Sequence, residues 1–181
     1  MRKIAPIFIF VMVLLICLGT PPQTVLAVDV PEATTLTMWI DIKPGGCENP
    51  LNVKSRGVLP VAILGTSDLD VTTIDSASIR MVTDPADTDG VRPIRSRVQD
   101  VAAPPADVPT CTTTCSDTET GPDGFPDLTL KFKTQDVVEL LGDVSDGDCV
   151  VLYLKDISGD NLLGQDVVLI LKKGKMKFKM K

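Results

Sequence analysis

Apolar and polar side chains alternate strictly along residues 35–43, where every second residue is apolar. The apolar positions are Leu36, Met38, Ile40 and Ile42. Because successive side chains of a strand point to opposite faces, this period of two predicts one half-buried β-strand. The Pro-Gly-Gly run at 44–46 ends it. The same alternation over residues 128–133 predicts a second strand of this kind.

A nearly unbroken apolar run occupies Val58 to Leu64 between two glycines. Such a run is typical of a strand that is buried on both faces, and Pro60 within it favours an edge or a bulge. Shorter apolar segments predict further strands at 51–53, at 79–82, within 91–101, at 149–154 and at 166–171.

Residues 134–141 have the signals of a helix, with Thr134 as the N-cap, Asp136 in the first turn and Gly142 after the last turn. About eight short strands and one short helix, without a βαβ rhythm, predict an all-β fold. The expected architecture is an antiparallel β-sandwich, immunoglobulin-like or similar.

The N-terminal segment has the pattern of a secretory signal peptide. Two basic residues precede an apolar run over residues 7–18, which is shorter than the ~20 residues that span a membrane. The Val-Leu-Ala sequence at 25–27 predicts cleavage after Ala27, and an uncleaved anchor is the alternative. The chain then divides into a signal peptide (1–27), a linker (28–34), a β-sandwich domain (35–173) and a Lys-rich tail (174–181).

Charge is distributed unevenly along the chain. The 18 basic and 24 acidic residues give a net charge of −6, yet residues 172–181 contain six lysines and no acidic residue. A nucleic-acid-binding domain places its basic patch on the folded part, so nucleic acid is not an expected partner. The tail either extends the last strand and protects its edge or draws the chain to an anionic surface.

The chain contains no histidine. Ser-His-Asp triads, Cys-His dyads and His-ligated zinc sites within this chain are therefore excluded. A carboxylate-based secreted hydrolase or inhibitor is the alternative, but one Trp and one Tyr give little surface on which to stack sugars. We expect a protein that is not an enzyme.

Four cysteines follow the predicted signal peptide, namely Cys47, Cys111, Cys115 and Cys149. An even number in a secreted chain predicts disulfides, and four cysteines allow three pairings. We favour Cys111–Cys115, because three residues separate these two, and this choice leaves Cys47–Cys149. The alternative is a zinc site of four thiolates, which lacks the usual paired spacing.

Residues 103–127 have no strand pattern, and their second half has features of a calcium-binding loop. Acidic residues stand at relative positions 1, 5 and 9, with Gly124 at position 6 for the sharp turn. Position 12 is Leu130, where a glutamate is expected, and a plain Asp-Gly turn is the alternative. The predicted Ca²⁺ ligands are Asp117, Glu119, Asp123, the carbonyl of Phe125, and Asp127.

Five segments carry a resemblance to a known family: 40–45 (IDIKPG), 49–66 (NPLNVKSRGVLPVAILGT), 70–80 (DVTTIDSASIR), 123–138 (DGFPDLTLKFKTQDVV) and 142–148 (GDVSDGD). Together they resemble a β-rich module of bacterial and archaeal secreted proteins, over roughly residues 38–173. The resemblance implies an extracellular module without assigned catalysis. Similar modules often have Asp-x-Asn-x-Asp-Gly-x-x-Asp before the DLTLKF strand; here Glu119 and Gly121 replace the first Asp and the Asn.

These observations predict a secreted, non-catalytic β-sandwich module for adhesion, surface association or accessory binding, with calcium bracing the 117–127 loop. The expected partner is an extracellular protein or polysaccharide. No transmembrane span is expected in the mature chain, and the expected location is extracellular or on the cell surface.

Overall fold

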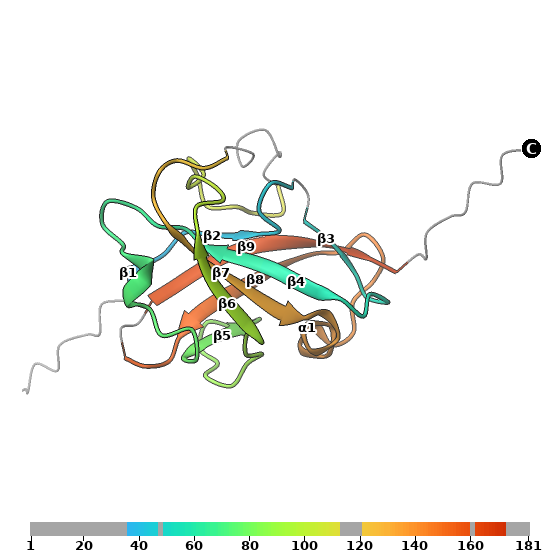
Figure 1. Cartoon of the computed structure of the whole chain (residues 1–181). Coiled ribbons are helices and arrows are strands. Elements are labelled where there is room, and N and C mark those ends of the chain that lie inside the picture. The colour runs from blue at the N-terminus through green and yellow to red at the C-terminus, as the bar shows by residue number, and fades with distance from the viewer. Residues whose placement is uncertain (1–35, 47–48, 113–120, 160–161, 173–181) are drawn as a thin grey trace, which may run out of the picture. The chain divides into compact units, whose positions relative to one another are not determined.

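The computed structural model describes residues 36–46, 49–112, 121–159 and 162–172, in which nine β-strands form two sheets (Figure 1). One sheet contains β1 (Leu36–Thr37), β9 (Leu162–Leu171), β8 (Cys149–Asp156) and β5 (Ile79–Val82) in this order, with β3 (Pro50–Asn52) also on β9. The other contains, in order, β2 (Ile40–Ile42), β4 (Val58–Ile63), β7 (Asp127–Lys133) and β6 (Arg95–Gln99). The prediction of an all-β fold is thus confirmed.

The two sheets form the layers of a sandwich, and β4, β6 and β7 cross in front of β8 and β9 in Figure 1. The inward-facing residues of both layers are apolar and fully or almost fully buried. They include Ile40, Ile42, Leu59, Val61, Ile63, Leu128, Leu130 and Phe132 from the four-stranded sheet, and Ile79, Met81, Leu152, Leu154, Val168 and Ile170 from the five-stranded sheet. Branched aliphatic side chains therefore supply most of the core.

The alternating segment 35–43 does not form the single strand that its pattern predicts. Its first part is β1, which pairs in parallel with β9, and its last part is β2, which pairs with β4 in the other sheet. Between them, the N–H of Met38 donates to the carbonyl of Leu163 at 3.0 Å, while the carbonyl of Trp39 accepts from Leu64 at 2.9 Å. The chain changes sheets here, and the period of two continues through the change because Met38, Ile40 and Ile42 all face the core.

The five-stranded sheet is mixed, not purely antiparallel as expected. Both β1 and β3 pair in parallel with the same edge of β9, β1 at its start and β3 at its end. The chain leaves this edge after β1, runs through the other sheet as β2 and returns as β3. The middle of β9 therefore lies beside the chain segment that crosses between the sheets.

Pro60 is accommodated inside β4 although this strand pairs on both sides. Its carbonyl accepts from the N–H of Lys43 at 2.9 Å, just beyond the end of β2. The carbonyl and N–H positions of one strand residue point to the same side, so the missing donor of Pro60 falls where β2 has already ended.

The predicted helix is present with the expected bounds as α1 (Thr134–Leu141), and Gly142 follows it with φ +65°. Lys133, not Thr134, occupies the N-cap position, and Val137 is fully buried in the core. A short 3-10 turn at Val71–Thr73 is capped by Asp70, whose side chain accepts from the N–H of Thr72. Among the described residues, no helix is long and apolar enough to cross a membrane.

Candidate functional site

The outer face of the four-stranded sheet carries a row of basic side chains. In β6 and β7, Arg95 lies opposite Lys131, and Arg97 lies opposite Thr129. In β7, the side chains of Leu128, Leu130 and Phe132 face the core. Because side chains alternate along a strand, Lys131 and Thr129 of β7 point to the solvent side, and so do the paired residues Arg95 and Arg97 of β6. The three cationic side chains are all exposed.

These residues line a groove of about 540 Å³ on that face, which we call the cationic groove. Its floor and walls also contain hydroxyl, amide and apolar groups. The remaining lining residues are Pro44, Pro60, Val61, Ser96, Gln99, Val101, Thr129 and Leu130. None of the described lining residues is acidic, although the whole chain has a net charge of −6.

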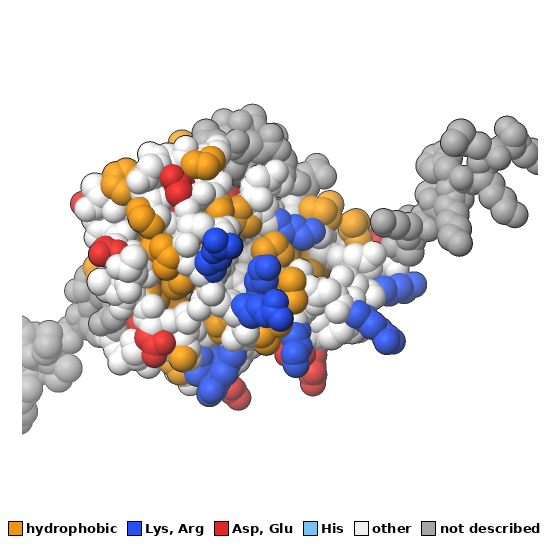
Figure 2. All heavy atoms as spheres, viewed as in Figure 1, with side chains coloured by type: hydrophobic (Ala, Val, Ile, Leu, Met, Phe, Trp, Pro, Cys, Tyr) orange, Lys and Arg blue, Asp and Glu red, His pale blue; other side chains and the backbone are white. Residues whose placement is uncertain are grey.

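The three cations of the groove have no carboxylate partner among the described residues. The ion pair between Lys133 and Asp136 is an exposed contact of 3.9 Å outside the groove, and it adds little stability. Figure 2 shows Lys and Arg side chains gathered over the middle of this face, with Asp and Glu mostly around its margin. The groove therefore presents uncompensated positive charge.

A second polar cluster lies at the opposite edge of the same sheet, where the edge strand β2 passes close to β9. Asp41 of β2, Asn49 before β3 and Asp166 of β9 line a cavity of about 20 Å³ that we call the acidic cavity. Its other walls are Ile40, Ala103, Pro105 and Pro109. Asp41 faces outward from its sheet, opposite Ala62, yet it is only 7% exposed because residues of the 103–109 segment cover it.

Hydrogen bonds fix two of these three side chains. Oδ2 of Asp166 accepts from the N–H of Ile42 at 2.7 Å and from Nδ2 of Asn49 at 3.1 Å, and Oδ1 accepts from the N–H of Val167 at 2.7 Å. Nδ2 of Asn49 donates its other hydrogen to the carbonyl of Val167 at 3.1 Å. Asp166 thus satisfies an edge N–H of β2 and joins the two sheets.

Two acceptors at this cluster are unpaired. Oδ1 of Asn49 is buried and has no hydrogen-bond partner among the described residues. The Asp41 carboxylate likewise accepts no hydrogen bond from the part of the chain that the structure describes. Burial, followed by the nearby carboxylates of Asp166 and Asp127, raises the pKa of Asp41 to about 7.

Burial also raises the pKa of Asp166, to about 6, although the hydrogen bonds from Ile42, Val167 and Asn49 lower it. The increase in pKa caused by desolvation of the carboxylate therefore exceeds the decrease caused by the three hydrogen bonds. Both carboxylates of the acidic cavity are consequently held in surroundings that oppose their negative charge.

The predicted calcium loop is only partly within the described residues, since Asp117 and Glu119 lie outside them. Asp123 is exposed, and its Oδ1 accepts from the N–H of Phe125 at 2.9 Å in a turn. Asp127 is fully buried, and both of its oxygens accept backbone N–H groups: Gly65 at 2.9 Å, Val101 at 2.7 Å and Ala102 at 3.2 Å. Calcium binding by this loop stays a prediction, and Asp127 has a structural role in it.

Asp100 is a residue that sequence reasoning missed. Its carboxylate accepts from the N–H groups of Asp123 at 3.1 Å and Gly124 at 2.8 Å, and so holds the turn before β7. Gly124 has φ +97°, which agrees with the expected sharp turn. No local sequence pattern indicates this role, because Asp100 lies 23 residues before Asp123, whose turn it caps.

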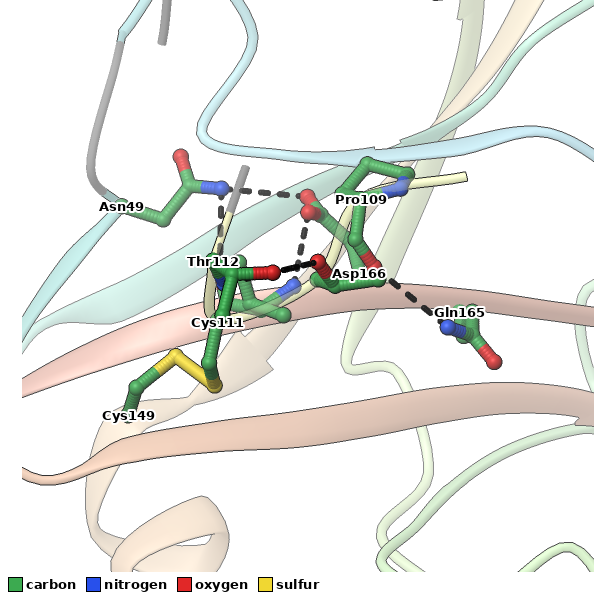
Figure 3. Close-up of a disulfide and its surroundings, with 9 residues drawn as sticks. Asn49, Pro109, Cys111, Thr112, Cys149, Gln165 and Asp166 are labelled. Carbon is green, nitrogen blue, oxygen red and sulfur yellow. Dashed lines mark hydrogen bonds between the residues drawn. A yellow bond between two sulfur atoms is a disulfide. The ribbon is translucent and has the colours of Figure 1, made fainter. Parts of the chain in front are cut away.

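The favoured disulfide pairing is wrong. Cys111 bonds to Cys149, the first residue of β8, with a Cα–Cα distance of 5.6 Å (Figure 3). This bond excludes both Cys111–Cys115 and Cys47–Cys149, while Cys47 and Cys115 themselves lie outside the described residues. Short sequence separation suggested the local pair, but the fold brings the 103–112 segment against the five-stranded sheet. There, Nε2 of Gln165 also donates to the carbonyl of Pro109 at 3.4 Å.

Other predictions fall outside the described residues. The signal peptide, its cleavage site near Ala27, the linker and the Lys-rich tail at 174–181 all lie there. Within the described residues, no group of three or more Asp, Glu, Cys or His side chains converges on a metal position. Comparison with family models, with curated proteins and with solved structures finds no significant match to this chain.

Proposed function

We propose that this protein is a secreted, non-catalytic β-sandwich module, of an immunoglobulin-like or similar class, that binds acidic extracellular polysaccharide through the cationic groove. The observation that carries the proposal is the set of Arg95, Arg97 and Lys131 on one sheet face, without a carboxylate partner among the described residues. In a chain with a net charge of −6, such a concentration of positive charge favours a specific anionic partner.

Two observations support an extracellular location. The N-terminal residues have the basic and apolar segments of a signal peptide. The Cys111–Cys149 disulfide belongs to an oxidising compartment, because cytosolic thiols are kept reduced.

The lining of the groove supports binding more than hydrolysis. It offers guanidinium, ammonium, amide and hydroxyl groups, but among the described residues it contains no carboxylate to act as a proton acceptor. Glycoside hydrolysis ordinarily needs two such carboxylates on either side of the bond.

The same lining favours a carboxylated or sulfated polysaccharide as the ligand. A guanidinium donates two parallel hydrogen bonds to a carboxylate or sulfate group, which gives Arg95 and Arg97 geometric selectivity for such groups. Pro44, Pro60 and Val101 add apolar surface against which the carbon faces of a sugar ring can pack. Gln99 and Thr129 supply neutral hydrogen bonds for its hydroxyls.

Affinity electrophoresis of the purified oxidised protein in gels that contain polygalacturonate tests this proposal, with dextran as the neutral polymer. We expect retardation by polygalacturonate alone, and its loss as salt rises from 20 to 500 mM, since exposed charges are screened. The Arg95→Gln/Arg97→Gln variant should bind about tenfold more weakly, because each exposed ion pair contributes up to about 1 kcal/mol.

The matched control is Lys54→Gln/Arg56→Gln, which removes two exposed cations outside the groove and changes the net charge equally. It should retain binding. Equal losses in the two double variants would mean that only net charge matters and would refute a specific groove. Loss of binding on deletion of residues 174–181, with the arginine variant unaffected, would assign the contact to the tail.

A further inference from the structure

Strand β6 is the last strand of its sheet, and among the described residues no strand pairs with its outer edge. Its inner edge is bound to β7, where the carbonyl of Arg97 accepts from Oγ1 of the opposite residue Thr129 at 2.8 Å. The main-chain groups of successive strand residues point to opposite sides. The N–H and C=O groups of Ser96 and Val98 therefore point to the outer edge, where a further strand can bind them.

The core-facing side of β6 is incompletely covered. Val98 lies opposite Leu128 of β7, a core residue that is only 4% exposed, so these two side chains share the core-facing side. Val98 is nevertheless 44% exposed, and Ile94, just before β6, is 45% exposed. Nearby, the hydroxyl of Ser76 donates to the hydroxyl of Ser96 at 3.0 Å. A strand added at this edge thus covers apolar surface at Val98 and polar surface at Ser96.

The solvent side of β6 determines which strand this edge accepts. Arg95 and Arg97 are two residues apart on that side, which is about 6.8 Å along a strand. Every second residue of an added strand repeats at the same distance, so carboxylates at alternate positions match the two guanidinium groups. A second copy of this chain is a poor match, because pairing β6 with β6 places arginines beside arginines.

We propose that β6 binds an extended acidic peptide segment of an extracellular partner protein by antiparallel strand addition. Acidic residues at alternate positions of the peptide face Arg95 and Arg97. The apolar residues between them cover Val98, and their N–H and C=O groups pair with those of Ser96 and Val98. In this mode of recognition, main-chain hydrogen bonds supply affinity and side chains supply specificity.

This inference goes beyond the proposed polysaccharide binding and does not rest on it. A polysaccharide lacks the regular alternation of N–H and C=O groups that a strand edge binds, so the edge favours a peptide. The two ligands share Arg95 and Arg97, whereas Val98 is not among the residues that line the cationic groove. Variants of Val98 therefore separate the two kinds of binding.

Fluorescence polarisation with a labelled synthetic peptide of nine alternating Asp and Val residues tests the proposal on the oxidised protein. We expect saturable binding, and no binding of the matched peptide that has Lys in place of Asp. The Arg95→Gln/Arg97→Gln variant should bind the Asp–Val peptide about tenfold more weakly, because two exposed ion pairs are lost. Lys54→Gln/Arg56→Gln should bind it as the parent protein does.

Two N-methylated forms of the Asp–Val peptide distinguish strand addition from charge attraction alone. Methyl groups on the valine nitrogens remove the N–H groups that face β6, whereas methyl groups on the aspartate nitrogens lie on the far edge of the peptide. We expect the first form to bind at least tenfold more weakly than the unmodified peptide, since several hydrogen bonds are lost, and the second to bind about equally. Equal binding of all three peptides would overturn strand addition.

Two variants of Val98 make the same comparison from the side of the protein. Val98→Pro removes the outward N–H, at an edge position where proline is tolerated, and Val98→Ala keeps that N–H. We expect Val98→Pro to bind at least tenfold more weakly than Val98→Ala, with circular dichroism melts to verify that both fold. If Val98→Pro does not fold, the N-methylated peptides on the parent protein decide.

Three results overturn the proposal. The first is no binding of the Asp–Val peptide by the parent protein at 1 mM. The second is equal binding by folded Val98→Pro and Val98→Ala. The third is binding that persists in Arg95→Gln/Arg97→Gln but is lost on deletion of residues 174–181, which would assign the peptide to the tail.

Discussion

Asp127 shows how one buried carboxylate can connect three segments that are distant in sequence. Its oxygens accept the N–H groups of Gly65, Val101 and Ala102, so it joins the end of β4, the segment after β6 and the start of β7. A Cβ at Gly65 would lie 2.1 Å from the carbonyl oxygen of Pro126, and this close approach explains the glycine there. The residue predicted as a metal ligand thus has a structural role.

Replacement of Asp127 by Asn should lower the free energy of unfolding by about 2–4 kcal/mol, because an amide group cannot accept at both of its ends and leaves buried N–H groups unpaired. Urea denaturation at pH 7 measures the change. Asp143→Asn is the matched control, since Asp143 is exposed and has no hydrogen bond among the described residues; it should stay within about 0.5 kcal/mol of the parent protein. A similar small effect at Asp127 would contradict the structural role.

At the level of strands and segments, the local pattern of side chains does not determine which sheet a segment joins. Residues 35–43 keep their alternation but serve two different sheets as β1 and β2. The pattern correctly placed Ile40 and Ile42 toward the core and Asp41 on the opposite face. The pattern could not indicate that residues of the 103–109 segment cover Asp41, because Asp41 lies more than sixty residues before that segment.

The Cys111–Cys149 disulfide yields a prediction for peptide mapping without reduction. Trypsin releases residues 98–131, which contain Cys111 and Cys115, and residues 134–155, which contain Cys149. We expect these two peptides to be joined by a disulfide, and to separate on reduction. A peptide 98–131 that is free of 134–155 and has an internal bond would instead restore the local pair Cys111–Cys115.

The same bond should also stabilise the fold. Its ends are 38 residues apart, and closing a loop of this length restricts the unfolded chain by about 4 kcal/mol in the chain-entropy account. Cys149→Ser and Cys111→Ser should each lower the unfolding free energy by a similar amount, and the double variant by little more than either one. Additive losses would show that the two residues act separately.

At the scale of the whole molecule, the two edges of one sheet carry opposite electrostatic character. The outer face of β6 and β7 presents the cationic groove, whereas the acidic cavity lies beside β2 at the other edge of the same sheet. The net charge of −6 gives no indication of this separation, since it only sums the two.

A small apolar cluster on the outside of the four-stranded sheet gives a spectroscopic test of cooperativity. Ala62, Leu64 and Ala102 form it, and Trp39, the single tryptophan of the chain, packs against them. We expect Trp39 fluorescence, excited at 295 nm, and far-ultraviolet circular dichroism to report the same urea transition, because Ala62 is in β4, which also supplies the main core, and Trp39 directly precedes β2. An earlier fluorescence transition would mean that the covering segment near Ala102 unfolds on its own.

By itself the sequence determined the all-β class, the positions of most strands and the bounds of α1, because these depend on local periodicity and on turn and capping residues. Only the tertiary structure decided which strands share a sheet, that β1 and β3 run parallel to β9, and that Cys111 meets Cys149. It also decided that Arg95, Arg97 and Lys131 share one face and that Asp41, Asn49 and Asp166 share one cavity. The physical reason is common to all of these: each depends on contacts between segments far apart in the chain, and no local pattern of side chains encodes which segments will meet.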